Sequence, residues 1–154
     1  MALSIDRQME ELNDLIRFDR DAIGAYDEAI QAIHHTELRD RLVHFRGDHE
    51  RHITELSAVV LRLGGQPVDR PDFKGAVRKT LTKIAGLVGT ETVLRAMKSN
   101  EELINRTYSR HAAMDFPRDV LDLVQRNFQD EQHHLAWIDQ ALRTRLWEQA
   151  PVHP

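Results

Sequence analysis

The sequence predicts an all-α fold, an antiparallel four-helix bundle in which two helical hairpins are joined by a long crossover. The first observation behind this prediction is the composition: 41% hydrophobic, 30% charged and 6% aromatic residues, with seven glycines and five prolines in 154 residues. Such a composition favours helices over a β-sandwich. The second is that four long segments carry apolar residues at helical spacing. The third is an internal repeat, in which the last two segments reproduce the polar pattern of the first two.

The first hairpin is expected from two helices with almost no loop between them. Ser4 can cap a helix over residues 5–34, whose apolar side chains fall on one stripe. A second helix over 37–63 follows, and Gly64-Gly65 ends it. A connection this short makes the two helices antiparallel neighbours.

A long connection separates this hairpin from the second one. Residues 64–89 form the crossover, and the apolar spacing over 73–87 predicts a short helix within it. Two further helices are expected over 91–114 and 117–147. The length of the chain suits one hydrophobic core, so we expect a single domain over 1–154.

Polar residues of the same kinds occur twice, each member of the second set 82 positions after its counterpart. The sets are Asp19, Tyr26, His49 and His52, then Glu101, Tyr108, Glu131 and His134. A rotation of about 100° per residue places their acids and histidines on the apolar stripes, near mid-helix. Burial of unpaired carboxylates is costly, and a divalent cation, or a pair, offsets that cost. The sequence therefore predicts a two-metal site with the ligands Asp19, His49, His52, Glu101, Glu131 and His134.

Other interpretations of these residues are open. A lone buried histidine or acid is more often a core residue satisfied by hydrogen bonds or by an arginine or lysine, but six at matched intervals favour metal. A degenerate site, descended from a metal site and now held by hydrogen bonds, is an intermediate alternative. Tyr26 and Tyr108 lie two turns beyond the carboxylates, where a phenol can bond a ligand carboxylate, relay electrons or simply pack in the core.

The pattern resembles the ferritin-like superfamily, and bacterioferritin and rubrerythrin in particular, over all four long helices. The run Asp130-Glu131-x-x-His134 is the most specific segment, and Asp19 with Tyr26 resembles the first helix of bacterioferritin. The layout is also similar to that of small bacterial ferritin-like proteins. The resemblance implies a ferritin-like bundle with the six ligands above and two iron ions, with zinc or manganese as alternatives.

The chain departs from bacterioferritin in ways that change the expected chemistry. His49 replaces the metal-bridging Glu, Asp19 replaces a longer Glu, and Glu50 stands where the haem-ligating Met would be, so no haem is expected. Three carboxylates balance only three of the four charges of two divalent ions. We therefore expect a site that forms less readily or binds one ion more tightly, with Glu131 as the bridge and the better-supported ion beside Glu101. No fifth helix is visible, which argues against a 24-subunit cage.

The function expected from this pattern is that of a di-metal oxidase or ferroxidase, which reacts with O₂ or peroxide in iron handling or stress defence. The alternative is a non-enzymatic, dimeric stress or scaffold bundle with a structural, mononuclear or degenerate metal site. Absence of cysteine excludes thiolate zinc sites, iron–sulfur clusters and disulfides. A formal charge of −4 gives no reason to expect nucleic acid. No signal peptide or membrane-length apolar run is visible, so we expect a cytoplasmic protein, and an apolar crossover helix favours a homodimer.

Overall fold

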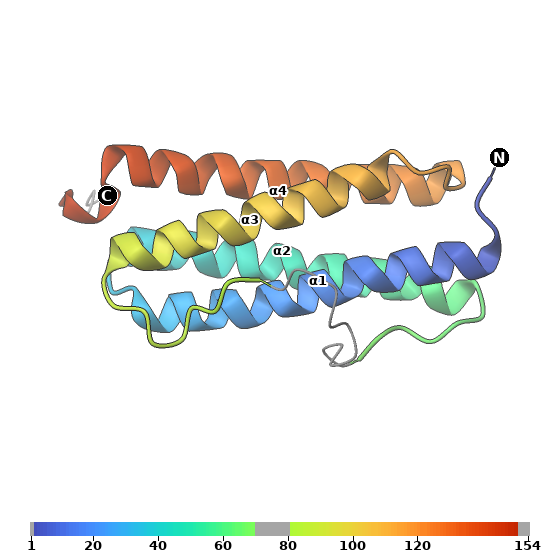
Figure 1. Cartoon of the computed structure of the whole chain (residues 1–154), viewed down its shortest axis with the longest axis horizontal. Helices are drawn as coiled ribbons and strands as arrows, with labels where there is room; N and C mark the ends of the chain where they lie inside the picture. The colour runs from blue at the N-terminus through green and yellow to red at the C-terminus, as the bar shows by residue number, and fades with distance from the viewer. Residues whose placement is uncertain (1, 70–80, 151–154) are drawn as a thin grey trace.

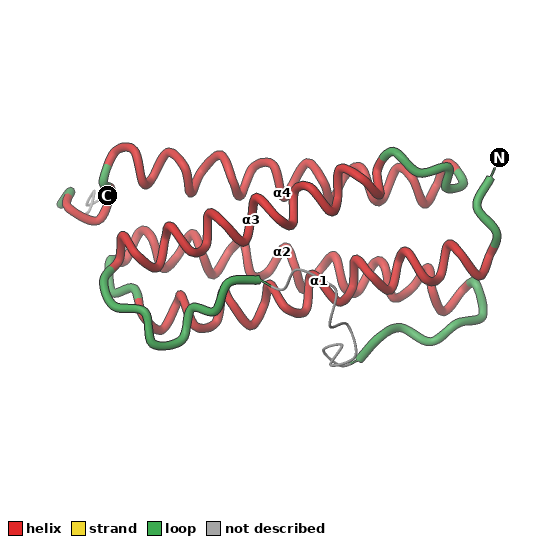
Figure 2. The backbone as a smooth tube through the Cα atoms, in the orientation of Figure 1, coloured by secondary structure: helices red, strands yellow, loops and turns green. Residues whose placement is uncertain are grey.

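Four long helices lie side by side in the computed structural model, which describes residues 2–69 and 81–150 (Figures 1 and 2). The helices are α1 (Ile5–Ala32), α2 (Thr36–Arg62), α3 (Thr90–Ala112) and α4 (Arg118–Thr144), and a 3₁₀ turn, η1 (Leu146–Glu148), follows. α1 and α2 run antiparallel, as do α3 and α4, whereas α2 and α3, which precede and follow the crossover, run in the same direction (Figure 1). The predicted all-α bundle of two hairpins is confirmed.

Local interactions explain where the first hairpin begins, turns and ends. Ser4 Oγ accepts the N–H of Arg7 at 3.2 Å and so caps α1, as the sequence predicts. The helix ends at Ala32, two residues earlier than expected, because His35 instead caps α2 with its side chain. Gly64 ends α2 with a φ of 90°, a conformation that favours glycine.

The crossover differs from the prediction of a short helix over 73–87. Its described part, 81–87, contains a turn but no helix, and 73–80 lie outside the described residues. The N–H groups of Ile84 and Ala85 donate to Glu28 Oε2 at 3.2 and 2.9 Å. Asn100 of α3 likewise accepts the N–H of Thr82 and donates to its carbonyl. Side chains of α1 and α3 therefore satisfy backbone groups that a helix would have paired internally.

The second hairpin also ends differently from the expectation. Arg145 adopts a left-handed backbone with a φ of 48°, so α4 stops at Thr144 and the chain continues as the 3₁₀ turn. The predicted helix over 117–147 is thus interrupted near its end. No described helix is long and apolar enough to span a membrane.

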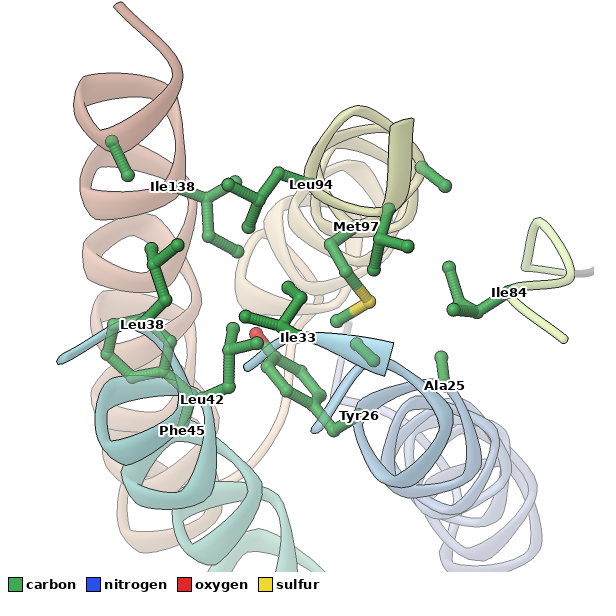
Figure 3. Close-up of a cluster of buried hydrophobic side chains, with 14 residues drawn as sticks. Ala25, Tyr26, Ile33, Leu38, Leu42, Phe45, Ile84, Leu94, Met97 and Ile138 are labelled. Carbon is green, nitrogen blue, oxygen red and sulfur yellow. The ribbon is translucent and has the colours of Figure 1, made fainter. Parts of the chain in front are cut away.

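Two apolar clusters fill the bundle, one toward each end. The first surrounds Tyr26 and includes Phe45, Met97 and Ile138, and Ile84 of the crossover packs against it (Figure 3). The second contains apolar residues of all four helices, among them Leu15, Leu56, Ile104 and Val124. On α2, α3 and α4 buried polar residues lie between the two clusters, and on α1 Asp19 lies between Ile16 and Ala22, near the end of the second cluster. A layer of buried polar side chains therefore lies at mid-bundle, where each helix is held rigidly on both sides.

Candidate metal centre

All six predicted ligands meet in this polar layer, and each is fully buried, with 0% exposure. α1 supplies Asp19, α3 supplies Glu101, and α2 and α4 supply two residues each. Their donor atoms form two groups, each within 4.8 Å: Asp19, His49, His52 and Glu131, and His49, Glu101, Glu131 and His134. Side chains more than a hundred positions apart in sequence converge because the two hairpins pack with their polar stretches at the same level.

Glu131 places one carboxylate oxygen in each group. Oε1 lies 3.3 Å from His49 Nδ1 and 3.2 Å from His52 Nδ1, whereas Oε2 lies 3.3 Å from His134 Nδ1. A carboxylate in this position can bridge two cations, as the sequence analysis expected of Glu131.

His49 is also shared between the two groups. Its Nδ1 lies 2.7 Å from Asp19 Oδ1, and its Nε2 lies 3.6 Å from Glu101 Oε1. The ring therefore stands between the two groups, where bacterioferritin has a bridging acid. A neutral imidazole has one lone pair and can serve only one cation at a time.

Several buried polar atoms of the layer have no hydrogen-bond partner among the described residues. They are His49 Nε2, His134 Nδ1, Glu101 Oε2 and both oxygens of Glu131. An unsatisfied buried polar atom costs about 1–3 kcal/mol, and more when it is charged. These unpaired imidazole nitrogen and carboxylate oxygen atoms lie close together. Divalent metal ions bind to such atoms, so the residues present fit metal binding.

Two outer carboxylates fix the orientation of two histidines. His52 Nε2 lies 2.9 Å from Asp130 Oδ2, and His134 Nε2 lies 2.8 Å from Asp48 Oδ2. Because the carboxylates only accept, each Nε2 carries a proton and donates it, so in the neutral ring, the form that binds a metal, the Nδ1 lone pair points into the layer. Arg51 bonds both Asp48 and Asp130 and links the two pairs.

Asp48 and Asp130 were not predicted as functional residues. A signal for them existed, since each directly precedes a ligand pair and both obey the interval of the repeat. Asp48 of α2 contacts His134 of α4, and Asp130 of α4 contacts His52 of α2. Both contacts depend on how α2 and α4 pack.

The two tyrosines also cross between the hairpins. Tyr26 of α1 donates its phenol to Glu101 Oε1 at 2.5 Å, and Tyr108 of α3 donates to Asp19 Oδ2 at 2.6 Å. Both rings are fully buried. Of the interpretations left open by the sequence, the geometry displays both the hydrogen bond to a carboxylate of the layer and the packing of each ring in an apolar cluster.

Electrostatics within the metal-free layer favour protonated histidines beside ionised acids. Burial alone would lower the histidine pKa values, but the surrounding carboxylates raise the pKa of His49 to about 9, of His52 to about 11 and of His134 to about 12. Burial would likewise raise the pKa of Asp19 and Glu101, yet the neighbouring histidines lower both. Protons on the three histidines thus balance the charge of the three acids when no cation is bound.

Burial shifts the pKa of the two tyrosine phenols upward, whereas it shifts the pKa of the histidines downward. It raises the pKa of both Tyr26 and Tyr108 well above 10, and the neighbouring Glu101 and Asp19 carboxylates raise it further. The phenols therefore stay protonated at neutral pH and keep donating to the carboxylates.

A match to a family model covers residues 7–113, more than half of the chain. The chain belongs to the family described as a domain of unknown function, DUF2383. The match includes α1, α2 and α3, and it ends before α4 supplies Glu131 and His134. No curated protein sequence matches the chain.

Two solved structures are similar to this one. A structure described as ferritin-like, diiron-carboxylate proteins from Bacillus anthracis is 16% identical with a TM-score of 0.73, over 92% of this chain and 99% of that one. A two-domain protein from Anabaena variabilis, with DJ-1/ThiJ/PfpI-like and ferritin-like domains, is 14% identical with a TM-score of 0.78. The match covers 99% of this chain and 41% of that protein. At these identities the likeness establishes a ferritin-like fold.

Proposed function

We propose that this chain is a di-metal oxidoreductase of the ferroxidase type, which binds two ferrous ions and uses O₂ or peroxide as the oxidant. The observation that carries the proposal is the position of Glu131, which offers one oxygen to each of two groups of buried donors. Support also comes from the fold, which is similar to that of a protein described as a diiron-carboxylate protein.

Three residues would hold each ion, and Glu131 would be common to both. Glu101, Glu131 and His134 would hold one, and Asp19, His52 and Glu131 would hold the other, with His49 available to either group. When bound, a ferrous pair supplies two electrons, enough to reduce O₂ to hydrogen peroxide or hydrogen peroxide to two molecules of water. Three carboxylates leave a charge of +1 on such a site, which favours the divalent state over the trivalent one.

The remaining residues of the layer hold these donors in place. Asp48 and Asp130 keep two histidines turned inward, and the phenols of Tyr26 and Tyr108 hold one oxygen each of Glu101 and Asp19. Outside Asp130 lies a polar pocket of about 250 Å³ between α2 and α4, lined by Arg51, Glu55, Arg126, Asn127, Gln129 and Asp130. We propose this pocket as a route by which a small oxidant approaches the layer from solvent.

A second function is favoured by the charge balance of the metal-free layer. Three protonated histidines neutralise three carboxylates, so the bundle can persist as a structural protein with one zinc or manganese ion or with none. A homodimer is expected under both functions. Sedimentation equilibrium of the purified chain tests whether it forms.

Anaerobic loading with Fe(II), followed by exposure to air, separates the two functions. The ferroxidase proposal predicts O₂ consumption and a rise in near-ultraviolet absorbance, both lost in Glu131→Gln. A matched control is Glu50→Gln, which removes the same charge from an exposed position beside His49. Wild-type protein that binds Fe(II) but consumes no O₂ would contradict the proposal and support the structural alternative.

A further inference from the structure

A second cluster of possible metal ligands lies near one end of the bundle, where α1 begins and α3 ends (Figure 1). It consists of Glu11 and Asp14 of α1 and His111 of α3, whose donor atoms lie within 4.8 Å of one another. His111 is 0% exposed and Glu11 4% exposed, and Asp14 is partly buried. None of the three belongs to the mid-bundle layer, since Glu11 precedes Asp19 by eight positions, about 12 Å along the helix axis.

The hydrogen bonding of His111 leaves a lone pair aimed at a carboxylate. Its Nδ1 lies 2.7 Å from the carbonyl oxygen of Thr107, and because a carbonyl only accepts, Nδ1 carries the ring proton. In the neutral ring, Nε2 is then an acceptor, and it lies 2.9 Å from Glu11 Oε2, which is an acceptor too. Nε2 has no hydrogen-bond partner among the described residues.

Two buried acceptors this close require a positive charge between them. One source of that charge is a second proton on the ring. The other is a metal ion bound by Nε2. A ligand histidine characteristically donates its other ring N–H to a backbone carbonyl, as His111 does to Thr107.

We propose that His111, Glu11 and Asp14 form a third metal site, which binds one divalent transition-metal ion of the Zn²⁺ class. Imidazole nitrogen and carboxylate oxygen are both zinc ligands, and a site with three protein ligands keeps its fourth position for water. His111 also lies in the last turn of α3, where the helix dipole favours a cation.

Two arginines moderate the affinity of this site. Arg7 Nη2 lies 2.5 Å from Glu11 Oε1, and Arg17 Nη1 lies 2.9 Å from Asp14 Oδ1. These guanidiniums offset the carboxylate charges and compete with an incoming cation. The oxygen of Glu11 that faces His111 is Oε2, and Arg7 holds the other one. The third site is therefore weaker than a site with the same ligands and no arginines.

Zinc stoichiometry tests the proposal, because it counts ions independently of any oxidase activity. With Zn²⁺ in excess and both mid-bundle groups filled, dialysed wild-type protein should retain three ions per chain. His111→Asn, which keeps a donor toward Thr107 but removes Nε2, should retain one fewer. The matched control His34→Asn changes an exposed histidine and should retain as many as wild type. Equal zinc in His111→Asn and wild type would overturn the proposal.

Crystals of the wild-type protein provide a measurement that does not depend on the variant folding. Anomalous maps at the zinc edge should contain a peak about 2.0–2.1 Å from His111 Nε2. Density at mid-bundle with none beside His111 would overturn the third site and leave the proposed function intact. Density beside His111 alone would support the third site and count against the di-metal centre.

Discussion

The Nε2 atom of His134 on α4 lies 2.8 Å from Asp48 Oδ2 on α2, so a carboxylate of α2 orients a histidine of α4. The reciprocal contact joins His52 of α2 to Asp130 of α4 at 2.9 Å. The tyrosines of α1 and α3 form the same kind of reciprocal contact, in which each phenol donates to a carboxylate of the other helix. Neither hairpin can complete its own donor set, which ties the centre to the assembly of the whole bundle.

Loss of an outer carboxylate should weaken metal binding without removing a ligand. Asp48→Asn deprives His134 of its acceptor, and we expect a roughly 10–100-fold lower affinity for Zn²⁺ or Fe²⁺, measured by competition with a chromophoric chelator. Asp139→Asn, which removes a carboxylate that pairs with Lys98 on the outer face of α4, serves as the control. Similar affinities in the two variants would show that Asp48 does not orient a ligand.

Restoring an acid at position 49 should strengthen the binding of two ions. His49→Glu makes four carboxylates, so two divalent ions give a neutral site, and a bridging carboxylate joins the groups that the imidazole now separates. We expect tighter binding of the second Fe²⁺ ion and faster oxidation of the iron, followed by isothermal titration and by stopped-flow absorbance. Equal or weaker binding would count against the charge argument.

Removal of a buried phenol should destabilise the metal-free protein. Tyr26→Phe leaves Glu101 Oε1 without its short hydrogen bond, and we expect a loss of about 1–3 kcal/mol in the free energy of unfolding, measured with urea. Tyr108→Phe should act likewise through Asp19. Unchanged stability in both would mean that the phenols only pack in the core.

Alkaline pH should destabilise the protein when no metal is bound. Folded His49 has a pKa of about 9 against an ordinary value of 6.5, so its contribution is fully present below pH 6.5 and is lost as the pH rises through 9. His52 and His134 have pKa values of about 11 and 12, so the loss of stability continues at higher pH. We expect a lower urea midpoint at pH 10 than at pH 7.

Metal should remove this dependence, because a bound cation takes the place of the histidine protons. Binding should release protons, and the number released is measured by calorimetry in buffers of different ionisation enthalpy. A pH-independent midpoint in the metal-free protein, or binding without proton release, would contradict the charge balance described for the layer. On acidification the sign reverses, since Asp19 has a lowered pKa and its contribution is lost as the pH falls.

Helical rotation was enough to predict which polar side chains meet inside the bundle. Asp19, Glu101 and the two ligand pairs share stripes with apolar residues, so burying those stripes brings the six together whatever the details of packing. The crossover could not be predicted in the same way. Glu28 binds the backbone of Ile84 and Ala85 from 56 and 57 positions away, and no local period reveals a contact of that range.

The side-chain contacts between different helices could not be predicted from the sequence either. Asp48 and Asp130 repeat at the interval of the ligands, but only the packing of α2 against α4 shows that each serves the other helix. The sharing of His49 between both donor groups likewise depends on the position of its ring, since Nδ1 and Nε2 face different carboxylates.

The central claim is that the mid-bundle layer binds two cations, and anomalous scattering at the iron edge tests it most directly. Crystals grown anaerobically with Fe(II) should give two peaks in the layer, one on each side of the Glu131 carboxylate. Diffraction maps without a peak among the six side chains, with the histidines closed onto the acids, would contradict the account.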